Sequence, residues 1–86
     1  MLVDYSRSFK KQYKKLSKDT KIKFLERLQI YLVDPLHPQL NLHKLHGKFY
    51  GLYSINITGD YRAVLDKETP EVSYFVAIGT HSELYS

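Results

Sequence analysis

The residues of this chain best suited to acid-base chemistry are its four histidines, His37, His43, His46 and His81. Imidazole titrates near neutral pH, so one histidine can accept a proton while a second donates one in the same reaction. Such a pair suits the cleavage of RNA, in which the 2′-hydroxyl loses a proton and the 5′-oxygen gains one. The chain contains no cysteine, which excludes thiolate nucleophiles, disulfides and cysteine-ligated metal sites.

These histidines differ in their positions along the chain. His37 adjoins Pro38 and His46 precedes a glycine, so a solvated loop residue is the simpler interpretation of each. The spacings of six and three residues between His37, His43 and His46 match no standard structural zinc motif, and we predict no metal site. His43 and His81 are 38 residues apart, so only the fold can bring them together.

Basic residues are concentrated between Arg7 and Lys23, where eight lysines and arginines accompany a single acidic residue, Asp19. The whole chain carries a formal net charge of +4, so the remainder is net acidic. The basic segment is either a solvated helix face or a surface for RNA or an acidic partner. Elsewhere, Arg62 is a surface charge or a cation for a phosphate, and Asp60 is a turn residue or part of a site.

Apolar periodicity predicts the helices that must position these side chains. A strand is expected over 2–5, followed by a helix that Ser6 or Ser8 caps. A second helix ends near Asp34, because Pro35 disfavours helical backbone in the residue before it. The apolar face of this second helix is expected to contain Ile22, Leu25, Leu28 and Leu32, flanked by Phe24 and Tyr31.

Beyond residue 51 the apolar period changes to two, which is typical of strands. Alternation over 52–57 and 61–65 predicts a hairpin, and 72–78 is a further strand with Phe75 and Ile78 on opposite faces. The order β-α-α-β-β-β predicts an α+β fold, in which a two-helix hairpin packs on a mainly antiparallel four-stranded sheet.

The length of the chain predicts one domain over 1–86. No apolar run is long enough to cross a bilayer, and no signal peptide is recognisable. We therefore expect a cytoplasmic protein with no membrane contact.

In their order and spacing, these segments resemble the RelE/ParE superfamily of bacterial toxins, and within it the YafQ-like branch of mRNA interferases. The resemblance covers nearly the whole chain. It rests on a lysine-rich helical hairpin that ends at Asp34-Pro35 and on three later segments, His43-Lys44-Leu45-His46-Gly47, Gly59-Asp60-Tyr61-Arg62 and Ile78-Gly79-Thr80-His81-Ser82-Glu83-Leu84-Tyr85.

The resemblance implies the toxin of a type II toxin-antitoxin system. Such a toxin is a ribosome-dependent endoribonuclease that cuts mRNA in the ribosomal A site and so inhibits translation. Cleavage would proceed through attack by the 2′-hydroxyl, without a metal or other cofactor. The implied partners are the ribosome, its mRNA and a cognate antitoxin that holds the toxin inactive in a hetero-oligomer.

The resemblance also implies roles for individual residues. His43 and His81 would share the acid and base roles, while Asp60 would orient a histidine or the RNA. Arg62 resembles an arginine that other RelE-type toxins aim at the scissile phosphate, although the YafQ-like pattern lacks it. Asn56 stands where that pattern has another histidine. The implied RNA-binding residues are Lys44, Lys48, Asn56 and Tyr85, the last by stacking on a base.

Two other functions suit the same fold, because function depends on the site rather than on the fold. ParE-like members of the superfamily bind and inhibit DNA gyrase without cutting RNA, and a decayed domain would retain only partner binding. The combination of His43, Asp60 and His81 favours the nuclease, whereas Asn56 in place of a histidine favours the decayed domain.

Overall fold

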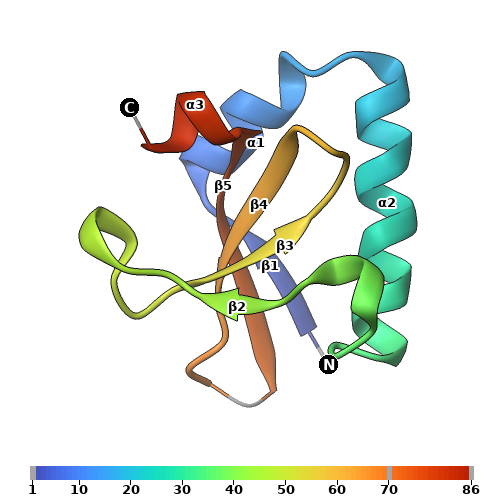
Figure 1. Ribbon diagram of the computed structural model, residues 1–86. Helices are drawn as coiled ribbons and strands as arrows, with labels where there is room; N and C mark the ends of the chain where they lie inside the picture. Colours follow the sequence, from blue (N-terminus) through green and yellow to red (C-terminus); the bar gives the residue numbers. More distant parts are fainter. Residues whose placement is uncertain (1, 70, 86) are drawn as a thin grey trace.

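The computed structural model describes residues 2–69 and 71–85, and in it a helical hairpin covers one face of a five-stranded sheet (Figure 1). The strands lie in the order β1-β5-β4-β3-β2, with β1 parallel to β5 and the other neighbours antiparallel. The predicted α+β fold is confirmed. The elements are β1 (Leu2–Tyr5), α1 (Arg7–Lys14), α2 (Lys18–Val33), β2 (His43–Lys44), β3 (Tyr53–Asn56), β4 (Tyr61–Asp66), β5 (Val72–Thr80) and α3 (His81–Tyr85).

Serine side chains begin both long helices. The Ser6 hydroxyl accepts a hydrogen bond from the Phe9 amide at 2.9 Å, and the Ser17 hydroxyl accepts one from the Thr20 amide at 3.2 Å. Each bond satisfies an amide that has no partner within the first helical turn. The end of α2 at Val33 agrees with the predicted stop before the proline.

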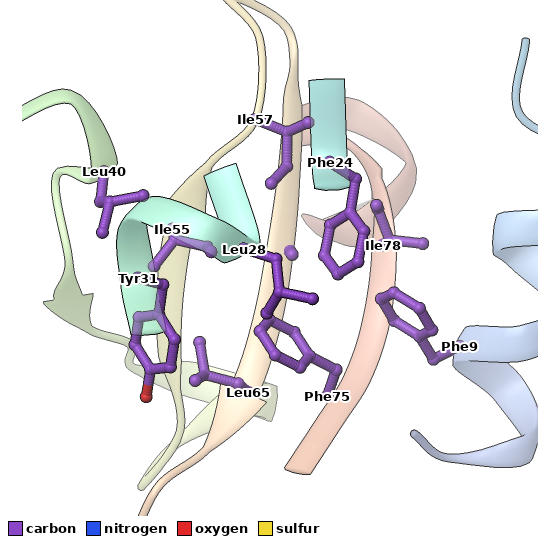
Figure 2. Packing of buried hydrophobic residues seen from close by; sticks show 11 residues of the cluster. Phe9, Phe24, Leu28, Tyr31, Leu40, Ile55, Ile57, Leu65, Phe75 and Ile78 are labelled. Carbon is purple, nitrogen blue, oxygen red and sulfur yellow. The ribbon is translucent and has the colours of Figure 1, made fainter. Parts of the chain in front are cut away.

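An aromatic core lies between the helices and the sheet (Figure 2). Phe24 is 1% exposed, and its ring centroid lies 5.4 Å from that of Phe9 and 5.5 Å from that of Phe75. The buried face of α2 is formed by Phe24, Leu28 and Tyr31, whereas Ile22 and Leu25 are 47% and 50% exposed. The predicted face of α2 was therefore wrong for Ile22 and Leu25, because burying the two large rings stabilises a different rotation of the helix.

A bulge in β5 changes which of its side chains face the helices. Val64 pairs with Ala77 but Leu65 pairs with Phe75, so Val76 is an extra residue on β5. Phe75 and Ile78 consequently both join the core under the helices. The prediction that they lie on opposite faces was wrong, because strict alternation does not survive an inserted residue.

The sheet has one strand more than the four predicted. In β2, His43 pairs with Ser54 and Lys44 with Tyr53, on a segment expected to be loop. The following segment folds back so that the Leu45 amide donates to the Leu52 carbonyl at 2.9 Å, which brings β2 alongside β3. A strand of two residues carries too little alternation to be recognised from sequence.

Candidate active site

The candidate site lies on the sheet face opposite the helices, which we call the site face. The strand register places two rows of side chains there, since directly paired residues point to the same face. The first row runs across β2 to β5 as His43, Ser54, Val64 and Ala77. The second row contains Asn56, Arg62 and Gly79.

The short helix α3 packs onto this face where Gly79 has no side chain. A Cβ atom at Gly79 would lie 3.2 Å from the Glu83 Oε1 and 3.6 Å from the Leu84 Cδ2. Leu84 is buried in a small apolar cluster with Leu45, Val64 and Ala77. The absence of a side chain at Gly79 thus allows α3 to rest on the sheet.

A reciprocal pair of hydrogen bonds begins α3. The Thr80 amide donates to the Glu83 Oε1 at 2.8 Å, and the Glu83 amide donates to the Thr80 hydroxyl at 3.1 Å. This arrangement is a capping box, which satisfies amides at a helix start. The same bonds lower the pKa of the Glu83 carboxyl below its ordinary value.

His81 and Tyr85 lie four residues apart on α3 and therefore share one side of it. Their ring centroids are 4.7 Å apart, and the Phe49 ring meets the Tyr85 ring edge-on at 5.7 Å. The His81 amide also donates to the Asp60 carbonyl at 3.2 Å, which ties the start of α3 to the turn between β3 and β4.

His43 is oriented by the backbone before it. Its Nδ1 lies 2.7 Å from the Asn41 carbonyl oxygen, and because a carbonyl only accepts, Nδ1 carries the hydrogen in this contact. In the neutral ring the Nε2 lone pair is then the basic position. Asn41 has a positive φ of 47°, a conformation that asparagine adopts more readily than most residues.

The Arg62 guanidinium is held by the turn that precedes its strand. Its Nη1 donates to the carbonyls of Thr58 at 2.9 Å, Tyr61 at 3.1 Å and Gly59 at 3.3 Å. The Thr58 hydroxyl in turn accepts from the amides of Asp60 and Tyr61. The turn therefore fixes a positive charge beside the first row of the site face.

A pocket of about 240 Å³ brings five of the eight predicted site residues together: His43, Lys44, Arg62, His81 and Tyr85. Leu45, His46 and Ser54 complete its lining. Two histidines far apart in the sequence thus reach one pocket, with an arginine and a lysine beside them.

The other three predicted residues do not line this pocket. Asp60 is exposed, and its main chain rather than its carboxylate contacts His81. Lys48 is exposed, with its Nζ 5.3 Å from the centroid of the Phe49 ring. Asn56 lies on the site face opposite Arg62, and its Oδ1 is buried without a hydrogen-bond partner in residues 2–69 and 71–85.

Several residues of the site were not singled out from the sequence. Ser54 is one, although the alternation of β3 already places it on the same face as Asn56. Phe49, which supports Tyr85, carried no such signal. The helix α3 was also missed, but the spacing of Thr80 and Glu83 matches a capping box and identifies its start.

A larger cavity of about 420 Å³ lies on the helical side, and no histidine lines it. Its lining combines Tyr5, Phe9, Tyr13, Phe24 and Leu25 with Lys10, Lys14 and Lys21. Within the described ranges, no three side chains of the metal-binding types gather closely enough to hold an ion. No helix in that part of the chain has the length and apolar character needed to span a membrane.

Comparisons with known proteins identify the family. A family model for YafQ, a bacterial toxin of type II toxin-antitoxin systems, matches residues 1–86. No curated protein matches the chain significantly.

Solved structures have the same fold. YafQ from E. coli strain BL21(DE3) has a TM-score of 0.82 at 22% identity, with 98% of this chain and 97% of that chain covered. A YoeB/ParE toxin from Agrobacterium tumefaciens has a TM-score of 0.77 at 16% identity, with 94% and 99% covered. A chain of the E. coli DinJ-YafQ complex has a TM-score of 0.72 at 25% identity, with 98% and 97% covered. Since the family model spans the whole chain, the protein belongs to the YafQ family and is a toxin of a type II toxin-antitoxin system.

Proposed function

We propose that this toxin is a ribosome-dependent mRNA endoribonuclease, a single domain that acts in the cytoplasm and inhibits translation. The observation that carries the proposal is the pocket that holds His43 and His81 together with Arg62 and Lys44. Two imidazoles can carry the two proton transfers of metal-free RNA cleavage, and two basic side chains can stabilise the charge that develops on the phosphate oxygens.

In the proposed reaction, the Nε2 of His43 accepts the proton of the ribose 2′-hydroxyl. The 2′-oxygen attacks phosphorus, the bond from phosphorus to the 5′-oxygen breaks, and His81 donates a proton to that oxygen. The products are a 2′,3′-cyclic phosphate and a free 5′-hydroxyl. His43 receives the base role because its Nδ1 already donates to the Asn41 carbonyl, which leaves Nε2 as the accepting nitrogen.

Other groups stabilise and position the RNA in this proposal. Arg62 and Lys44 offset the negative charge on the phosphorane oxygens, and Tyr85 stacks on a base. Lys48 contacts the phosphate backbone outside the pocket. Asp60 acts through its carbonyl, which holds the His81 amide, rather than through a carboxylate contact with a histidine. Each proton transfer has an assigned side chain, so the reaction calls on no cofactor.

Primer extension on mRNA from programmed ribosomes tests the proposal. The wild-type toxin should produce discrete cuts in the A-site codon, and mRNA without ribosomes should stay intact. Intact mRNA together with loss of gyrase supercoiling activity would indicate a ParE-like toxin. Absence of both activities would indicate a domain that only binds a partner.

We further propose that the cognate antitoxin binds the larger cavity between α1 and α2. An amphipathic acidic segment matches its chemistry, because four aromatic side chains line it together with Lys10, Lys14 and Lys21. The neighbouring side chain of Leu25, half exposed on α2, would be covered by such a segment. The E. coli DinJ-YafQ toxin-antitoxin complex provides a related case.

A charge reversal tests this docking site. Lys14→Glu should weaken the antitoxin complex by about tenfold or more at low salt, because it places like charges together. Lys11→Glu, on the same helix but outside the cavity, is the matched control and should retain affinity. Equal affinities of the two variants, measured by calorimetry, would place the antitoxin elsewhere.

A further inference from the structure

Two polar atoms on the site face are buried without hydrogen-bond partners. They are the Oγ of Ser54, whose residue is 1% exposed, and the Oδ1 of Asn56, and they are the only such side-chain atoms in the described part of the chain. Leaving a buried polar atom unpaired destabilises a protein, so native structures keep few of them. Their position beside the pocket suggests that a ligand provides the missing partners.

A second buried serine shows what this fold does when a hydroxyl has only a structural role. Ser73 is 2% exposed in β5, on the face covered by the helices, and its hydroxyl lies 2.7 Å from the Tyr31 hydroxyl. The two serines are thus similarly buried. They differ in that Ser73 is paired within the protein, whereas Ser54 lines the pocket.

The strand register places the two unpaired side chains opposite residues of the proposed reaction. Ser54 is directly opposite His43, and Asn56 is directly opposite Arg62. Both side chains come from β3 and point to the site face, two residues apart. Ser54 lines the pocket, and Asn56 lies two residues along on the same face of β3, so a ribose next to a phosphate held by His43, Arg62 and His81 would lie near this pair.

The hydrogen-bonding chemistry of the two atoms indicates which group of the ribose they would bind. The Asn56 Oδ1 only accepts hydrogen bonds, and within the RNA backbone only the 2′-hydroxyl has a proton to donate. The Ser54 hydroxyl can donate to the oxygen of that same group. The attacking 2′-hydroxyl gives its proton to His43, so the bound hydroxyl belongs to a neighbouring nucleotide.

We propose, as a consequence of the proposed nuclease function, that Ser54 and Asn56 bind the 2′-hydroxyl of a nucleotide that flanks the cleaved one. These residues then distinguish RNA from DNA at a position where no bond is made or broken. This role separates them from His43 and His81, which act on the reacting atoms.

Single-turnover cleavage of mRNA on programmed ribosomes, with toxin below saturation, tests this role. The probes are an all-ribose mRNA and two mRNAs with one 2′-deoxynucleotide immediately before or after the cleaved nucleotide. For the wild type, one deoxy substitution should slow cleavage by about tenfold, the effect of one lost hydrogen bond. Ser54→Ala should cut the all-ribose mRNA about tenfold more slowly and no longer respond to that deoxy substitution. Asn56→Ala should show the same pattern.

Thermal unfolding separates binding from a structural role. Ser54→Ala removes an unpaired buried hydroxyl, so its Tm should be unchanged or higher, whereas Ser73→Ala should have a lower Tm and keep the wild-type response to the deoxy substitution. Two results would overturn the inference: wild-type cleavage by Ser54→Ala, or a fall in its Tm with the deoxy response retained. A wild-type toxin that cuts no programmed mRNA would instead overturn the proposed function, and this inference with it.

Discussion

The two faces of the sheet are built by opposite rules. Beneath the helices, Phe9, Phe24 and Phe75 form a continuous aromatic core, and the buried hydroxyls of Tyr31 and Ser73 satisfy each other. On the site face, a cluster of four buried residues that includes Leu84 supports α3, and the pocket beside it contains basic side chains and a buried hydroxyl without a partner in the described residues. Consistency of packing and pairing stabilises a fold, whereas local departures from it are typical of functional sites.

This comparison predicts that substitutions on the two faces have separable effects. Changes beneath the helices should lower the free energy of unfolding without altering the chemistry of each folded molecule. Changes to the polar pocket residues of the site face should lower the cleavage rate while the free energy of unfolding stays nearly constant.

The largest effect on the site face is expected for His81→Ala. Loss of the proposed proton donor should slow single-turnover cleavage on programmed ribosomes by about 10²–10⁴-fold. The Tm should remain near that of the wild type, because the side chain is exposed. His37→Ala is the matched control, since His37 lies outside the pocket, and it should cleave normally. Similar rates for the two variants would remove His81 from the reaction.

The corresponding change beneath the helices is Phe24→Ala. It removes a ring that is 1% exposed and should lower the free energy of unfolding by about 3–5 kcal/mol, measured by urea titration. The cleavage rate per folded molecule should be retained. A loss of stability below about 1 kcal/mol would contradict the view that this cluster dominates the stability of the fold.

Gly79→Ala tests how closely α3 must approach β5 on the site face. The added Cβ would lie 3.2 Å from the Glu83 Oε1, so the Glu83 carboxyl must move by a few tenths of an ångström, which disturbs the capping box that begins α3 beside His81. We expect cleavage to slow by roughly tenfold or more, because small displacements of reacting groups are costly. Gly59→Ala is the control, since its Cβ would meet no atom within 4 Å. An unaffected rate in Gly79→Ala would show that α3 tolerates displacement.

The smallest predicted effect concerns pH and the capping box. The lowered pKa of Glu83 means that its ionised form is favoured by folding, so its contribution to stability is present above the ordinary value of 4.5. This contribution is lost as the pH falls through the lowered pKa of the folded state. Glu83→Gln can keep the box but does not titrate. The wild type should therefore lose protection of the α3 amides on acidification, measured by hydrogen exchange, while Glu83→Gln changes less.

Local signals in the sequence predicted the elements whose causes are local. Ser6 caps α1, and Pro35 ends α2, because each acts through its own backbone neighbourhood. Alternation similarly located β3 and β4, and it placed Arg62 on the face opposite Tyr61.

Features that depend on distant partners could not be predicted in this way. Val76 is an extra residue only in the pairing of β5 with β4. Likewise, the two residues of β2 form a strand only through their pairing with β3. The meeting of His43 and His81 in one pocket depends on the register of four strands, so the residues suggested the chemistry but the fold was needed to assemble it.

The position of β5 in the sheet determines how early the chain can fold during its synthesis. β5 lies between β1 and β4, so the first strand to be synthesised has no neighbour in the sheet until β5 follows all the others. Such non-local pairing delays folding relative to chains built from local contacts. Neither the aromatic core nor the pocket can form before Val72–Thr80 has been made. A nascent chain therefore lacks the assembled pocket for most of its synthesis.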